Sequence, residues 1–158
     1  LKSEIERSAH AKVAVLFIDV DDFKFINDRF GHSVGDEVIK YVAGCIKQRV
    51  KGSGFAGRFG GDEFVLCIND PKQIEEIESL SLDLIDELYE GYHSELANVS
   101  INVKASIGIA FYPEHGDDSN KVVAAADEAM YFVKKNGKAN YHIYQPEDSE
   151  MEDLQHTL

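Results

Sequence analysis

Residues 54–68 read GFAGRFGGDEFVLCI, with Gly60 and Gly61 between two apolar segments. Gly54–Phe59 on one side and Phe64–Ile68 on the other are typical of β-strands. Two consecutive glycines between strands indicate a hairpin, because the tight primed turns need positive φ angles. The stretch therefore predicts a β-hairpin near the middle of the chain.

Two carboxylates, Asp62 and Glu63, follow the glycines at the mouth of a strand that otherwise reads as buried. A carboxylate beside a core costs free energy unless it is paired, hydrogen-bonded or bound to metal. The hairpin is therefore the first place where we expect chemistry.

The chain has 158 residues, enough for one domain with a real core. No stretch approaches the apolar length needed to span a membrane, and Leu1–Lys12 is not a secretory signal. The chain starts without methionine and ends in an acidic tail, so we expect it to be a piece of a longer protein.

The net charge of −13 argues against broad, sequence-independent binding to DNA or RNA. It leaves room for a small anionic ligand held by lysines and a metal ion.

Cys45 and Cys67 both lie in apolar periodic segments, so we interpret them as core residues in an intracellular setting.

Hydrophobic periodicity and turn signals predict nine elements after an initial helical end at Lys2–His10. They are a strand at Val13–Ile18, helices at Phe23–Phe30 and from about Asp36 to Arg49, the two hairpin strands, a helix from Pro71 to about Tyr89, one long strand at Val99–Tyr112, a helix from Ser119 or Asn120 to Lys135, and a strand at Tyr141–Tyr144. This order predicts an α/β (α+β) sandwich, in which helices flank a central, mainly antiparallel five-stranded sheet.

Asp19 ends the first buried strand, and Asp21 and Asp22 follow it. Alone, this is an Asp-rich turn that terminates a strand. If the strand neighbours the hairpin, however, Asp19 and Asp62 converge at one edge of the sheet. Paired carboxylates of this kind hold Mg²⁺, which activates a hydroxyl and neutralises a triphosphate.

Further polar residues fit a nucleotide, although each also has an ordinary structural explanation. The loop from Asp19 to Lys24 enters a helix, whose N-terminal N–H groups bind phosphate well. Lys134 and Lys138 suit either a phosphate or the dipole at a helix end. Asn27, His32 and Asp36 carry groups that a guanine edge requires, or form a local turn, a loop and a helix cap respectively.

These segments together resemble the GGDEF domain of bacterial diguanylate cyclases, over about residues 10–145. The matching motifs, in order, are Leu16–Lys24, Ile26-Asn27-Asp28, Phe30-Gly31-His32, Gly35-Asp36, Arg58–Phe64, Ser106–Ala110, Ala126–Tyr131 and Lys134-Lys135. The resemblance implies a fold like the palm of nucleotidyl cyclases and polymerases. It also implies condensation of two GTP into cyclic di-GMP, with release of pyrophosphate.

The resemblance also assigns roles to individual residues. Mg²⁺ or Mn²⁺ would be held by Asp19, the Val20 carbonyl and Asp62, with Glu63 in support. Asp62 and Glu63 are thus the implied catalytic pair, Asp62 also helping to deprotonate the attacking 3′-hydroxyl. Substrate contacts would come from Asp22, Phe23, Lys24, Lys134 and Lys138 at the phosphates, and from Asn27, His32 and Asp36 at guanine.

Three features depart from the family pattern. An inhibitory product site, Arg-x-x-Asp, is usual before the glycines, but this chain has Lys51 and Gly54 there. Lys138 stands where Arg is frequent, and it lacks bidentate phosphate geometry. The usual N-terminal lead-in is absent. We therefore expect a GGDEF domain at 1–145 without that lead-in, and an acidic tail or linker at 146–158.

Each such domain binds one GTP, so the resemblance implies a homodimer of domains for catalysis. It also implies fusion to sensor domains and to a phosphodiesterase domain, in the cytoplasm, without nucleic acid and without membrane contact by this domain. Two alternatives remain: a non-catalytic GTP-binding module that regulates an adjoining phosphodiesterase domain, and a purely structural dimerisation domain.

Overall fold

The computed structural model describes residues 12–50, 52 and 54–149. The expected helical end at Lys2–His10 and most of the acidic tail lie outside them. The elements are β1 (Val13–Val20), α2 (Phe23–Phe30), α3 (His32–Lys47), β2 (Phe55–Arg58), β3 (Glu63–Asn69), α4 (Ile74–Glu90), β4 (Tyr92–Ser94), β5 (Val99–Ile101), β6 (Ala105–Tyr112), α5 (Ser119–Lys135) and β7 (Tyr141–Ile143).

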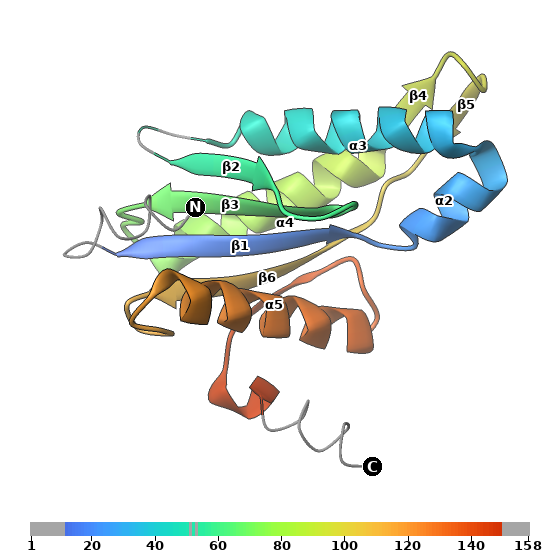
Figure 1. Cartoon of the computed structure of the whole chain (residues 1–158). Helices are drawn as coiled ribbons and strands as arrows, with labels where there is room; N and C mark the ends of the chain where they lie inside the picture. The colour runs from blue at the N-terminus through green and yellow to red at the C-terminus, as the bar shows by residue number, and fades with distance from the viewer. Residues whose placement is uncertain (1–11, 51, 53, 150–158) are drawn as a thin grey trace, which may run out of the picture.

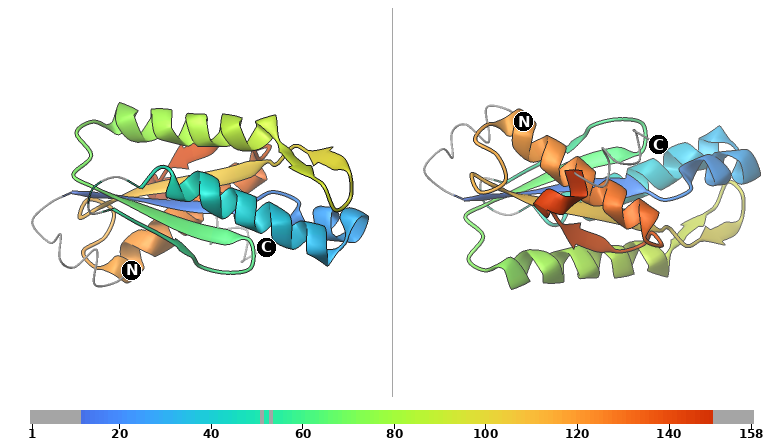
Figure 2. Two further views of the ribbon diagram at one scale, coloured as in Figure 1. Left: turned by 90° about the horizontal axis from the view of Figure 1, so that it is seen from above. Right: turned by 90° about the horizontal axis from the view of Figure 1, so that it is seen from below.

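The central sheet has five strands in the order β2-β3-β1-β6-β7. The first three pairings are antiparallel, and β7 runs parallel to β6. Figure 1 shows β1 at the centre of this sheet, and Figure 2 shows α4 and α5 on its opposite faces. The prediction of a mainly antiparallel five-stranded sheet flanked by helices is confirmed.

Strand β1 separates two hydrophobic cores, because successive side chains of a strand point to opposite faces. Its even-numbered residues from Ala14 to Ile18 pack with α3 and α4, and its odd-numbered residues from Val13 to Phe17 pack with α5. Asp19 continues the odd-numbered series. The strand therefore directs Asp19 to the α5 side of the sheet.

The single strand predicted at Val99–Tyr112 is wrong. Residues 102–104 interrupt it, and β5 pairs instead with β4, a strand that the sequence did not predict. The backbone N–H of Val103 leaves the sheet to bond the Leu88 carbonyl of α4, at 3.1 Å. The alternation of apolar residues continues through the break because Val103 is itself fully buried.

Helix α3 begins at His32, four residues before the predicted start at Asp36. Only Gly31, at φ 93°, breaks the helical path. Gly35 lies inside α3, where an added Cβ would come within 1.8 Å of Asn27 Oδ1 in α2. This glycine is thus a close-packing residue within the helix, and the predicted start at Asp36 is wrong. Asp36 is consequently not a helix cap.

Two other helix starts differ from their predictions. Helix α4 begins at Ile74 and not at Pro71. The N-cap of α5 is Asp118, whose side chain accepts the backbone N–H three residues later at 2.9 Å, so neither Ser119 nor Asn120 caps that helix. In both cases the helix and its C-terminal end are close to the prediction, because periodicity locates a helix better than its first residue.

Cys45 and Cys67 are both buried, as predicted for core residues. Within residues 12–149, apart from 51 and 53, no helix combines the length and apolar character that crossing a membrane requires.

Candidate active site

The register of β1 against β3 brings the predicted acidic residues together. Asp19 pairs with Glu63, and the Val20 N–H donates to the Asp62 carbonyl at 3.1 Å. Carboxylate oxygens of Asp19, Asp62 and Glu63 all lie within 4.8 Å of one another. The expected convergence of Asp19 and Asp62 at one edge of the sheet is therefore confirmed.

The turn that carries this cluster is held by hydrogen bonds rather than by unusual φ angles. The backbone N–H groups of Phe59 and Gly60 both donate to the Glu63 carbonyl, at 2.8 and 3.2 Å. Arg58 Nε donates to the Gly60 and Gly61 carbonyls, at 3.1 Å each. Neither glycine has a left-handed φ, so the predicted primed turn is wrong although the hairpin is present.

The space around the two glycines gives them a different role. A Cβ on Gly60 would approach Glu63 Oε2 to 3.3 Å, whereas a Cβ on Gly61 would meet nothing within 4 Å. The backbone of the turn is thus open on the Gly61 side. A ligand could approach it closely there, because no side chain stands in the way.

Burial and the neighbouring negative charges disfavour the ionised form of Asp19 in the acidic cluster. Burial raises the pKa of Asp19 to about 7, and Lys134 opposes that rise, while the negative charges of Asp62 and Glu63 reinforce it. Asp19 Oδ1 is also buried without a hydrogen-bond partner. Three clustered carboxylates, one with an orphaned oxygen, are the donor set that suits a hard divalent cation. The residues therefore fit Mg²⁺ or Mn²⁺.

Asp21, which the sequence did not single out as a site residue, lies beside this cluster. Its side chain is fully buried, and Lys134 Nζ lies 2.6 Å from its Oδ1 and 3.7 Å from Asp19 Oδ2. Period-two alternation from Asp19 could have found it, since Asp21 is two residues further on the same face.

The other predicted phosphate residues lie around the start of α2. Asp22 is its N-cap, in a left-handed conformation, and Lys138 Nζ contacts Asp22 Oδ1 at 2.8 Å. This hydrogen bond lowers the pKa of Asp22 and raises that of Lys138. Phe23 and Lys24 form the first turn of α2, Phe23 half-buried and Lys24 exposed. The N-terminus of α2, Lys24 and Lys138 thus lie around the loop after β1.

The three residues predicted to read guanine gather at the α2–α3 junction. Asn27 Oδ1 is buried without a partner, close against Gly35 of α3. His32 and Asp36 are both exposed and four residues apart in α3, so they share one face of that helix. Asn27 therefore has an acceptor without a partner, packed against Gly35, the residue before Asp36.

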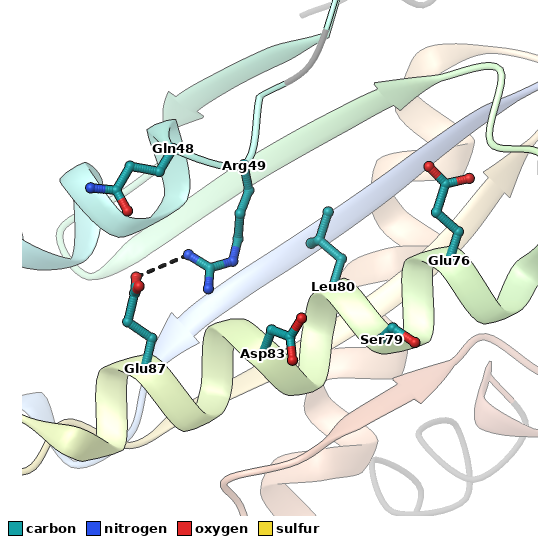
Figure 3. A pocket seen from close by; sticks show the side chains of 7 residues that line it. All are labelled: Gln48, Arg49, Glu76, Ser79, Leu80, Asp83 and Glu87. Atoms are coloured by element: carbon teal, nitrogen blue, oxygen red, sulfur yellow. Dashed lines mark hydrogen bonds and ion pairs between the residues drawn. The ribbon is translucent and has the colours of Figure 1, made fainter.

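A cavity of about 510 Å³ lies elsewhere, between α3 and α4, and contains none of the predicted site residues (Figure 3). Among the residues that the structure describes, the one cation lining it is Arg49, which already pairs with Glu87 at 2.9 Å. Glu76 and Asp83 also line it, which makes the cavity unsuited to a triphosphate.

Comparison with known proteins relates the chain to one family. The family model described as "Diguanylate cyclase, GGDEF domain" matches residues 1–140. The chain is 34% identical over 140 residues to the signaling protein YkoW of Bacillus subtilis, covering 88% of this chain. It is 35% identical over 134 residues to the bifunctional diguanylate cyclase/cyclic di-GMP phosphodiesterase MucR of Pseudomonas aeruginosa, covering 85% of this chain. It spans only 17% and 19% of the length of these two relatives.

Solved structures of GGDEF domains also match the fold of this chain. The GGDEF domain of PA1120 (YfiN or TpbB) from Pseudomonas aeruginosa matches with a TM-score of 0.85 and 30% identity, over 92% of this chain and 91% of that one. The GGDEF domain of DgcB from Caulobacter crescentus, solved in complex with c-di-GMP, matches with a TM-score of 0.81 and 25% identity, over 90% of this chain and 85% of that one. Motifs, fold and family match agree that this chain belongs to the GGDEF domain family.

Proposed function

We propose that this domain is a diguanylate cyclase, which condenses two GTP into cyclic di-GMP and two pyrophosphates. The observation that carries the proposal is the cluster of Asp19, Asp62 and Glu63, with the Lys134 ammonium beside it. Carboxylates and an ammonium at one edge supply the charges that a metal ion and a triphosphate require.

The residues divide into a metal-binding and a nucleotide-binding set. Asp19, the Val20 carbonyl and Asp62 would hold Mg²⁺ or Mn²⁺, with Glu63 in support. The bound ion would neutralise the triphosphate and make the attacking 3′-hydroxyl more acidic. The residues proposed to bind the phosphates are the turn at Asp22 and Phe23 together with Lys24, Lys134 and Lys138, and those proposed to bind guanine are Asn27, His32 and Asp36.

Each half-reaction joins the 3′-oxygen of one GTP to the α-phosphorus of the other and breaks the bond to the β-phosphate. The hydroxyl proton leaves toward Asp62, and pyrophosphate leaves toward the lysines. One domain holds one GTP, so two domains must face each other. A homodimer in the cytoplasm, where GTP is abundant, is therefore part of the proposal.

A fusion of the domain to a parallel dimeric coiled coil tests this function. With GTP and Mg²⁺ it should release cyclic di-GMP, detected by chromatography, and the same fusion carrying Asp62→Ala should not. If the wild-type fusion binds GTP but makes no product, the cyclase proposal is wrong.

That last outcome would favour the second candidate, a GTP-binding module that regulates an adjoining phosphodiesterase domain. One observation supports it. The cyclic di-GMP phosphodiesterase PdeR of Escherichia coli is 32% identical over 143 residues, and the chain spans 21% of its length. Calorimetry would then show GTP binding without turnover, whereas absence of both would indicate a structural dimerisation domain.

We further propose that the usual product site does not regulate this domain, because Lys51 and Gly54 replace its Arg and Asp. Turnover should be unchanged when cyclic di-GMP is added to a reaction that contains inorganic pyrophosphatase. Inhibition that persists in a Lys51→Ala variant would instead indicate a product site elsewhere.

A further inference from the structure

Asp21 is a buried carboxylate with every oxygen in use. Its Oδ1 accepts from Ser106 Oγ at 2.7 Å and from Lys134 Nζ at 2.6 Å, and its Oδ2 accepts the Ala139 N–H at 3.0 Å. These donors belong to β6, α5 and the loop before β7. Three elements distant in sequence therefore meet at this one side chain.

Hydrogen bonds to residues other than Lys134 already fix the Asp21 carboxylate. The Asp21 backbone N–H donates to the Lys104 carbonyl at 2.8 Å, and Ser106 and Ala139 each hold one carboxylate oxygen. The side chain consequently cannot rotate without losing a bond. With Ser106 bound to Oδ1, that oxygen can accept a further hydrogen bond from one direction only.

That direction determines where the Lys134 ammonium lies. Lys134 is in the last turn of α5, and a lysine side chain has four rotatable bonds with which to reach solvent. Its Nζ is nevertheless 2.6 Å from Asp21 and 3.7 Å from Asp19, with 21% of the side chain exposed. Asp21 thus holds the ammonium beside the acidic cluster and keeps it from closing fully onto Asp19.

We propose that Asp21 is a positioning residue, which acts through Lys134 by holding its ammonium where the β- and γ-phosphates of a nucleoside triphosphate would lie. The inference rests on the proposed GTP binding. An ammonium held in advance would lose little entropy when it meets a phosphate, so the aspartate would raise affinity without touching the ligand.

A purely structural ion pair would behave differently. Loss of a structural contact would loosen the whole site and weaken every nucleotide alike. Loss of a positioning contact would weaken only ligands that carry the distal phosphates. Comparing GTP with GMP separates the two roles, since both present the same base and sugar.

The test is calorimetry of GTP and GMP, each with Mg²⁺, on the wild type and on Asp21→Asn. We expect GTP affinity to fall about tenfold and GMP affinity to stay within about twofold. Asp86→Asn, an equal charge change at an exposed residue of α4, is the matched control and should alter neither. Equal losses for GTP and GMP, or no loss, would overturn the inference while wild-type GTP binding left the proposed function standing. A wild type that binds no GTP would overturn both.

A double-mutant cycle supplies the second test, which also applies if Asp21→Asn alone does not fold. Because Asp21 acts through Lys134, Lys134→Gln and Lys134→Gln/Asp21→Asn should bind GTP with the same affinity. The double variant replaces the ion pair by uncharged groups of similar shape, which favours folding. A further loss on adding Asp21→Asn would show that the aspartate does not act through the lysine.

Discussion

Two aspartates at the end of β1 share one side of the sheet and one lysine, yet their surroundings differ. Asp19 has a buried oxygen without a partner and a pKa raised to about 7, chiefly by burial. Asp21 is more deeply buried, and both its oxygens accept hydrogen bonds. Burial alone therefore does not decide whether a carboxylate oxygen lacks a partner: Asp19 keeps one such oxygen, which suits the proposed metal ion, and Asp21 keeps none.

The largest expected effect tests the Asp19 side of this comparison. In the dimerised domain, Asp62→Ala should lower cyclic di-GMP formation on the order of 100-fold or more, because a charge that stabilises the reaction is removed. The protein should stay folded, since Asp62 lies in the turn and not in the core. Retained activity in a folded variant would mean that the acidic cluster is not needed for the reaction.

The next effect tests the Asp21 side. Asp21→Asn should lower the free energy of unfolding by about 2 kcal/mol, because a hydrogen-bonded charge pair is lost. In a domain of this size that corresponds to a fall in Tm of about 4–8 °C. Thermal unfolding followed by circular dichroism measures it, with Asp86→Asn as the reference. A Tm equal to that of the reference would mean that the Asp21 contacts add nothing.

A third effect concerns pH. The pKa of Asp19 is about 7 in the folded chain against an ordinary 3.8, so the folded state binds more protons between these values. Without metal, stability should therefore fall as pH rises from about 4 to about 7. Asp19→Asn should flatten that part of the Tm profile, and Mg²⁺ at pH 8 should raise the Tm of the wild type only. A wild-type profile parallel to that of Asp19→Asn would contradict the raised pKa.

The smallest effect belongs to the neighbouring exposed pair. Asp22 and Lys138 lie 2.8 Å apart with side chains 58% and 40% exposed, and such surface pairs contribute little to stability. Asn tolerates the left-handed backbone at position 22, so Asp22→Asn should leave the Tm unchanged. GTP affinity should rise slightly, since Lys138 is then free to meet phosphate. A clear fall in Tm would mean that the contacts of Asp22 stabilise the fold, as we expect of the contacts of Asp21.

Local patterns predicted most elements because the cause of each is local. The apolar run of β1, the strands around Gly60 and Gly61, and the periodic stripes of the helices all depend on neighbours a few residues away. Two of the errors arose where a partner in another element decided the outcome. The start of α3 was predicted too late because the packing of Gly35 against Asn27 of another helix cannot be seen in the sequence. Val103 was predicted to lie in a strand because its bond to α4 cannot be seen there either.

The sequence by itself determined the family, the acidic hairpin and the expectation that Asp19 and Asp62 meet. Those conclusions follow from short motifs and from alternation along single strands. Only the tertiary structure distinguished Asp19 from Asp21, because the donors that satisfy Asp21 are Ser106, Lys134 and Ala139, 85 to 118 residues away. Whether a buried carboxylate is satisfied depends on such long-range partners, and the packing of α5 and β6 against β1 brings them to it.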